Sequence, residues 1–177
     1  EKAIKLEKDA LAQIENITAD NARLVSNLHA NLGGLYRMNG HPDLAREHME
    51  KSISLLDQFN LLHINDSIPQ IANYAMFLTE QQEPERGISE LQKLSGIIKE
   101  YHSDDCLDYA KVQETLGTIY LMTANLPQAK THFKRAFKIY EKIWADEPEM
   151  IEAKYQEIQE LYPQIGFSIG KTLSGLL

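Results

Sequence analysis

Residues 116–120 read Leu-Gly-Thr-Ile-Tyr, and residues 32–36 read Leu-Gly-Gly-Leu-Tyr. A related stretch, Tyr-Ala-Met-Phe-Leu, covers residues 74–78, and a weaker match, Ile-Gln-Glu-Leu-Tyr, covers residues 158–162. Each stretch begins 42 residues after the one before it. Because self-similarity at a fixed period is the sequence signature of stacked-repeat proteins, the pattern predicts a fold built from repeated units.

Other positions follow the same step of 42 residues: Ala45, Gly87 and Ala129; Met49, Leu91 and Phe133; and Gly40, Gln82, Ala124 and Gly166. In the first half of each unit a small residue follows a large one, so a neighbouring backbone can approach while the bulky side chain fills the remaining space. In the second half a small residue precedes a large apolar residue by four positions, as on the core-facing side of a helix. The pattern therefore predicts two antiparallel helices per unit.

Turn and cap residues separate the predicted helices. Pro42, Pro84 and Pro127 follow turn residues and stand near the first position of a helix, where a missing N–H is tolerated. Residues 65–67 and 103–105 are polar and typical of helix N-caps. No segment alternates apolar and polar residues long enough to predict a strand, so the expected fold class is all-α. The expected helices cover residues 1–16, 20–39, 42–60, 67–82, 84–101, 105–124, 127–145, 148–162 and 167–176.

The unit that spans residues 116–142 resembles the tetratricopeptide-repeat (TPR) signature: Leu-Gly, then Tyr three residues later, Ala nine further on, and a large apolar residue after four more. TPR units have about 34 residues, whereas the longer step here is similar to the kinesin-light-chain class. Residues 133–142 resemble the second helix of those repeats. The middle unit departs from the signature at Tyr74, Leu78 and Gly87 but keeps the register. The resemblance implies a right-handed superhelical solenoid of antiparallel helix pairs.

The repeat frame predicts one TPR domain over residues 1–177. We expect the end of a preceding repeat at 1–20, repeats at 23–64, 65–106 and 107–147, and a partial repeat or cap at 148–177. Because the frame starts and ends inside a repeat, we expect this sequence to be a piece of a longer protein. Near the end of the sequence, apolar residues recur at every fourth position and form a stripe on one predicted helix face: Ile165, Ile169, Leu173 and Leu177. Because the ends of a solenoid need a polar cap, another surface must cover this stripe, which predicts self-association through it.

Composition excludes some classes of partner. The formal net charge is −8, and nucleic-acid binding needs clustered Lys and Arg, so no nucleic-acid partner is expected. The nearest approach to a basic stripe, within residues 130–142, alternates with apolar residues and is interpreted as a solvated helix face. Apolar runs fall far short of the roughly 20 residues that cross a bilayer, so no membrane partner is expected. A single cysteine, Cys106, fits a reducing compartment, which favours the cytoplasm.

No constellation of catalytic residues stands out. Six histidines are scattered along the chain without a His-Glu-x-x-His motif or an i, i+4 pair. Gly33 and Gly34 lie inside a predicted helix at packing positions, and no Gly-Lys-Ser/Thr follows them. Cys106 has no histidine placed by the sequence as a partner. We therefore predict no enzyme activity, no cofactor and no metal site.

The predicted binding surface is the concave side of the stacked helices, which is lined by the first helix of each pair. Asn31 and Asn73 occupy the same position in the frame. Peptide-binding TPR proteins use asparagines to pair with a bound backbone, so the resemblance implies this role here; hydrogen bonding within the repeat or to water is the alternative. Ala30 and Ala72 stand where a lysine would help to hold an acidic chaperone tail, which disfavours a full carboxylate clamp. The expected groove residues are Asn27, Asn31, Arg37, Asn73, Thr79, Lys111, Glu114 and Thr118.

These observations predict a scaffold or adaptor that binds a peptide or helix of a protein partner in its groove. A regulatory sensor module is the alternative function. In that case a signalling peptide would change the superhelix and control an effector domain elsewhere in the protein.

Overall fold

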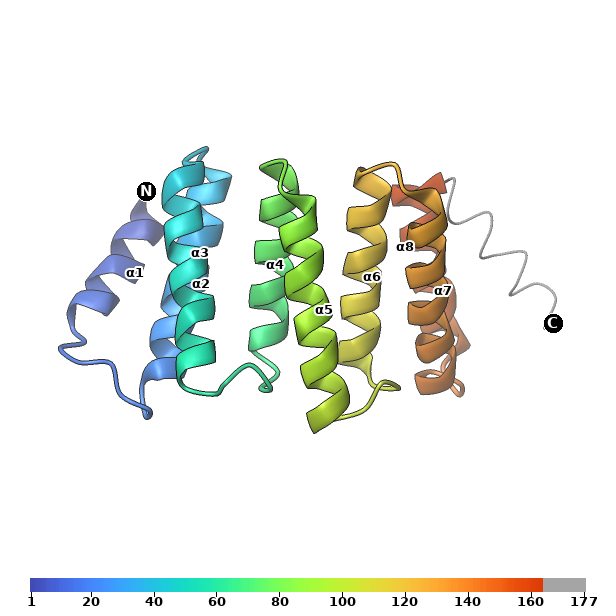
Figure 1. Cartoon of the computed structure of the whole chain (residues 1–177), viewed down its shortest axis with the longest axis horizontal. Helices are drawn as coiled ribbons and strands as arrows, with labels where there is room; N and C mark the ends of the chain where they lie inside the picture. Colours follow the sequence, from blue (N-terminus) through green and yellow to red (C-terminus); the bar gives the residue numbers. More distant parts are fainter. Residues whose placement is uncertain (164–177) are drawn as a thin grey trace. The chain divides into compact units, whose positions relative to one another are not determined.

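The structure, a computed structural model, describes residues 1–163. Throughout this range the regular elements are α-helices, which confirms the predicted all-α helical-repeat fold (Figure 1). The helices are α1 (Lys2–Ala12), α2 (Ala22–Met38), α3 (Pro42–Gln58), α4 (Ser67–Glu80), α5 (Pro84–Tyr101), α6 (Leu107–Met122), α7 (Leu126–Ile143) and α8 (Pro148–Leu161). The chain forms two compact units, residues 1–97 and residues from 98 onward, and the division falls inside α5.

Unit 1 buries the first and second copies of the repeated stretch. Leu32 and Tyr36 on α2 form one apolar cluster with Tyr74 and Phe77 on α4 and with Met49 on α3. Two residues of α1, Ile4 and Leu11, pack against the edge of this cluster. The apolar positions that repeat along the sequence are thus the positions that meet in the core.

Unit 2 repeats this arrangement with α6, α7 and α8. Leu116 on α6 is buried, and Phe133 and Phe137 on α7 form an apolar cluster with Ile158 on α8. Ile158 begins the weakest of the four repeated stretches and is 1% exposed. The weak match therefore carries a real core position.

Close packing of the two helices in each pair depends on one glycine. A Cβ built on Gly33 would lie 2.5 Å from Met49 Cγ, and one built on Gly117 would lie 3.0 Å from the Phe133 ring. In the middle pair the glycine is on the second helix instead, and a Cβ on Gly87 would lie 2.6 Å from the carbonyl oxygen of Ala75. The three pairs are Gly33 with Ala45, Ala75 with Gly87, and Gly117 with Ala129, so each combines one glycine with one alanine.

The turn inside each pair is also repeated in three dimensions. Gly40, Gln82 and Ala124, which are separated by the step of 42, all have left-handed φ angles, of 74°, 65° and 58°. The next residue donates its N–H to the carbonyl five residues earlier, at 3.0, 2.8 and 2.7 Å respectively. This is the hydrogen bond of a Schellman helix end. Only the first turn has the glycine that this conformation favours.

Some predicted boundaries and caps are wrong in detail. The first helix ends at Ala12 rather than near residue 16, because the Asn21 side chain accepts from the N–H of Thr18 and donates to the carbonyl of Asn16, which holds this segment as a loop. Asp66 precedes α4, but its carboxylate makes no cap hydrogen bond and binds Arg23 instead. At α6 the cap is Cys106, whose Sγ accepts from the N–H of Tyr109.

Two expectations about the surface have different outcomes. In the part of the chain that the structure describes, no helix is long and apolar enough to cross a membrane. The C-terminal stripe of Ile165, Ile169, Leu173 and Leu177 lies outside the described residues, so self-association through it stays a prediction.

Candidate peptide-binding site

A cleft of about 510 Å³ lies in unit 1 between α2 and α4, with α3 at its floor. Its lining comes from three helices: Ala30, Gly34, Arg37 and Met38 of α2; Met49 and Ser52 of α3; and Gln70, Asn73 and Glu80 of α4. Two predicted groove residues, Arg37 and Asn73, therefore line one cleft.

Gly34 leaves one wall of the cleft open. It lies in the middle of α2, where glycine costs about 1 kcal/mol relative to alanine. A Cβ built there would meet nothing within 4 Å, whereas neighbouring Gly33 faces Met49. The prediction that both glycines occupy packing positions is thus wrong for Gly34. Together with Ala30, one turn earlier, Gly34 gives the wall a shallow apolar surface.

A partly buried polar network supports the cleft. The hydroxyl groups of Ser26 and Ser52, both at most 1% exposed, lie 2.8 and 2.5 Å from Gln70 Oε1. Gln70 Nε2 in turn donates to Asn27 Oδ1 at 2.6 Å. The network links α2, α3 and α4, and hydrogen bonds that are partly shielded from water in this way rigidify the elements that they join. Asn27 acts in this support and is not among the residues that line the cleft.

The charges that line the cleft are paired with each other. The Arg37 guanidinium donates to both carboxylate oxygens of Glu80, through Nε at 2.8 Å and through Nη2. The neighbouring side chain of Met38 is 85% exposed. The cleft therefore offers neutral polar groups and apolar surface rather than a net charge.

The two matched asparagines have different environments. Asn31 Nδ2 donates to Glu7 Oε1 of α1 at 3.1 Å. Asn73 is exposed and lines the cleft, and among residues 1–163 its amide has no hydrogen-bond partner. Only Asn73 therefore presents a free donor and acceptor to the cleft.

The remaining predicted groove residues make local contacts. Thr79 and Thr118 each donate to a carbonyl one turn earlier, at 2.9 and 3.1 Å. In unit 2, Lys111 lies 3.9 Å from Asp108. Glu114 binds Lys154 of α8 at 2.8 Å and accepts from the Tyr140 hydroxyl at 2.6 Å. Glu114 thus joins three helices of unit 2.

Several cleft residues were missed at the sequence level. Ser52 and Gln70 belong to helices already predicted, but no repeated position marks them. A usable signal existed for Gly34, because Ala30 and Gly34 are four residues apart and share a helix face. Gln70 and Asn73 are three residues apart and share a face in the same way.

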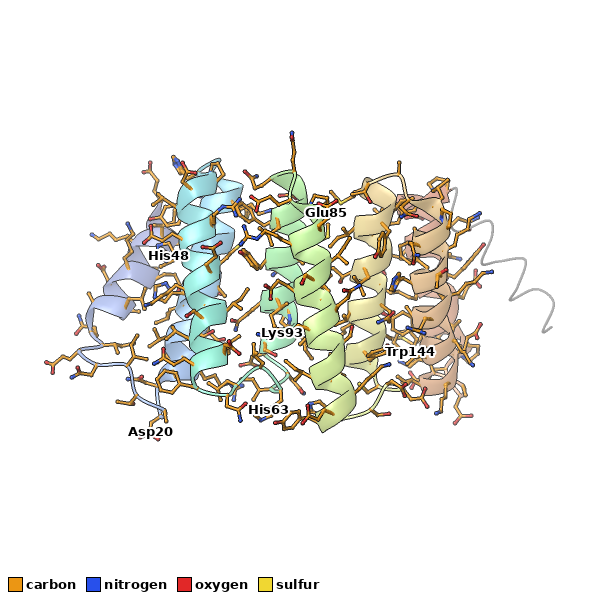
Figure 2. The ribbon with its side chains drawn as sticks, in the orientation of Figure 1. Asp20, His48, His63, Glu85, Lys93 and Trp144 are labelled. Atoms are coloured by element: carbon orange, nitrogen blue, oxygen red, sulfur yellow. The ribbon has the colours of Figure 1, made fainter. Side chains whose placement is uncertain are left out.

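A second feature missed in the sequence is a repeated pair of side chains beside a tyrosine ring. His29 Nδ1 lies 2.8 Å from His48 Nδ1, and His48, which projects from α3 (Figure 2), stacks on Tyr36 with the ring centroids 5.4 Å apart. In unit 2, His132 Nδ1 donates to Gln113 Oε1 at 2.9 Å and stacks on Tyr120 at 5.2 Å.

Burial governs the protonation of these histidines. It lowers the pKa of His29 to about 4, helped by the nearby charge of His48, and it also lowers the pKa values of His48 and His132. Across residues 1–163, no group of three or more His, Cys, Asp or Glu side chains could hold a metal ion. These histidines therefore serve as neutral hydrogen-bonding links between the helices of a pair.

The comparisons with known proteins agree with the repeat architecture. Residues 67–142 match the family model described as Tetratricopeptide repeat. A crystal structure of BtubC (BKLC) from P. vanneervenii is similar, with a TM-score of 0.69 and 21% sequence identity over 80% of this chain. That alignment covers 56% of the BtubC chain, and at this identity it supports the fold alone. No curated protein sequence gives a significant match.

Proposed function

Because the chain is a tetratricopeptide-repeat protein, we propose that the cleft between α2 and α4 binds an extended peptide segment of a partner protein. TPR domains are in general scaffolds for protein–protein interaction. The observation that carries the proposal is the open wall at Gly34 opposite the free amide of Asn73. The missing side chain at Gly34 leaves room for a ligand chain, and a free amide can pair with that chain's backbone.

The lining indicates the chemistry of the segment. Ala30, Gly34, Met38 and Met49 offer apolar surface for one side chain of the ligand, and full burial of a Leu-sized group contributes about 1.5–3 kcal/mol. Methionine side chains adapt to different shapes, so the apolar subsite tolerates several residue types. Because Arg37 and Glu80 neutralise each other, we expect an uncharged segment with one apolar anchor.

The test compares two glycines that differ only in their place in the fold. Gly34 and Gly96 both lie inside helices, and a Cβ at either would meet nothing within 4 Å, but only Gly34 lines the cleft. Peptides that bind the unmodified chain are first selected from a displayed random library. The affinity of each selected peptide is then measured for the unmodified chain, for Gly34→Leu and for Gly96→Leu. We expect Gly34→Leu to fill the cleft and weaken binding at least tenfold, while Gly96→Leu leaves it unchanged.

A second variant tests the polar contact. Asn73→Ala should weaken the same peptides by about threefold to tenfold, as for the loss of one or two hydrogen bonds, and should leave the melting temperature unchanged. Selected peptides that bind Gly34→Leu as tightly as the unmodified chain would show that the cleft is not the binding site.

A further inference from the structure

Unit 2 has a cleft of its own, of about 580 Å³ and of different character. It lies among the end of α5, the loop that precedes α6, the first turn of α6, and α7. Four cationic residues line it, together with Asp104, Asp105, Tyr109 and Ile139; the cations are Lys99, Arg135, Lys138 and Lys142. This concentration of positive charge contrasts with the net charge of −8 for the whole chain.

Only half of these cations are neutralised. Lys142 binds Asp105, and Lys99 lies 3.9 Å from Asp104. Arg135 and Lys138 are exposed, and within residues 1–163 neither has an ion-pair partner. The sequence pattern predicts a solvated helix face for this part of α7, and the structure places three of its cations, Arg135, Lys138 and Lys142, along a cleft that Lys99 of α5 also lines.

The walls of this cleft are firmly held. Tyr109 and Ile139 are at most 4% exposed, and Lys99 Nζ lies 5.3 Å from the centroid of the Tyr109 ring. On α7, the Tyr140 ring stacks on Trp144, which lies at the end of the helix (Figure 2), with the centroids 4.8 Å apart. The positions of Arg135 and Lys138 are therefore preorganised on a rigid helix, which lowers the entropy cost of binding.

We propose that this cleft binds an acidic segment of a partner protein, with carboxylates at alternate positions of an extended chain. Residues three apart on a helix, such as Arg135 and Lys138, have Cβ atoms about 5–6 Å apart. Alternate residues of an extended chain are about 6.5 Å apart and point to the same side. Two carboxylates at this spacing can each meet one of the two free cations, Arg135 and Lys138, while Lys99 and Lys142 stay paired with Asp104 and Asp105.

The experiment measures binding of a fluorescent peptide with glutamate at alternate positions, by anisotropy at low ionic strength. Arg135→Ala/Lys138→Ala should weaken binding about tenfold, as for the loss of two exposed charge pairs. The charge-reversed variant Arg135→Glu/Lys138→Glu should lose the acidic peptide and gain affinity for a matched peptide with lysine at alternate positions.

The matched control reverses charge elsewhere on the same helix. Lys130→Glu/Lys134→Glu changes the net charge by the same amount, and neither residue lines the cleft. We expect this control to retain most of the affinity, and circular dichroism to show unchanged helicity for all variants. Equal losses in the control and the cleft variant would overturn the proposal, because binding would then follow net charge alone. Displacement by inorganic phosphate at the concentration of the peptide would also overturn it, since the site would then bind a single anion.

Discussion

At the scale of single residues, the neutral histidine pair makes unit 1 sensitive to acid. The bond between His29 and His48 needs an acceptor nitrogen, so it is lost when both rings are protonated. In unit 2 the same geometry is achieved with the Gln113 carbonyl as the acceptor, which does not titrate. The two units therefore hold equivalent helix pairs together by bonds that differ in their response to pH.

The variant His29→Gln copies the unit 2 arrangement into unit 1. The folded pKa of His29 is lowered from 6.5 to about 4. A lowered pKa stabilises the fold above the unfolded pKa, and this contribution is lost as pH falls from about 6.5 toward 4. Over that interval the unmodified chain should lose more stability than His29→Gln. Because the ring is only half-buried, we expect the difference between the two losses in free energy of unfolding to be about 1–2 kcal/mol. Urea denaturation at several pH values measures the difference.

The converse variant provides the control. Gln113→His should introduce the same acid sensitivity into unit 2, because it recreates the two-histidine pair beside Tyr120. If His29→Gln loses stability with pH as steeply as the unmodified chain, the histidine pair is not the acid-sensitive contact.

The repeat frame could predict that Asn73 lines a cleft but not that Asn31 has a different environment. Both occupy one frame position, and the frame contains no information about α1. Glu7 of α1 binds the Asn31 amide, so the difference between the two asparagines comes from a neighbour outside the repeat. Likewise, which of two adjacent glycines faces α3 depends on the rotation of α2 about its axis, which the sequence alone does not fix.

At the scale of elements, helix bodies were predicted well and helix caps were not. Pro42, Pro84 and Pro148 begin helices where the sequence places them, because proline acts locally through its fixed φ and its missing N–H. A cap depends on what else its side chain can bind. Asp66 has Arg23 within 2.6 Å, a charged partner 43 residues earlier that no local pattern reveals.

The exchange of glycine and alanine in the middle helix pair leads to a prediction about packing. A Cβ at Gly87 would press on the backbone of α4, at Ala75, which a side-chain rotation cannot relieve. Gly87→Ala should therefore destabilise the protein by about 1–3 kcal/mol, as overpacking does. The double variant Ala75→Gly/Gly87→Ala recreates the order found in the other two pairs. We expect it to be less destabilised than the sum of the two single variants, in a cycle measured by chemical denaturation.

A variant on the same helix separates packing from helix propensity. Gly96→Ala adds the same methyl group to α5 in open space, so it should stabilise the protein by about 0.5–1 kcal/mol. Additive effects in the Ala75 and Gly87 cycle would mean that the two positions do not compensate for each other.

At the scale of the whole molecule, the two clefts belong to different compact units and differ in charge. In unit 1 the only charged side chains that line the cleft, Arg37 and Glu80, bind each other. In unit 2, Arg135 and Lys138 are unpaired within the described residues. The two proposals together predict that this chain binds two segments of different chemistry, one in each cleft, without competition between them.

Ionic strength distinguishes the two modes of binding in a single preparation. Exposed charges are screened over about 8–10 Å at physiological salt, so affinity of the unit 2 cleft for the glutamate peptide should fall steadily as salt is added. Peptides selected on the unit 1 cleft rely on apolar burial and neutral hydrogen bonds, and their affinity should change less than about twofold over the same range. The net charge of −8 repels acidic ligands at long range, and salt screens that repulsion too. A glutamate peptide whose affinity rises with salt would therefore show that this long-range repulsion outweighs Arg135 and Lys138, which contradicts a specific basic cleft.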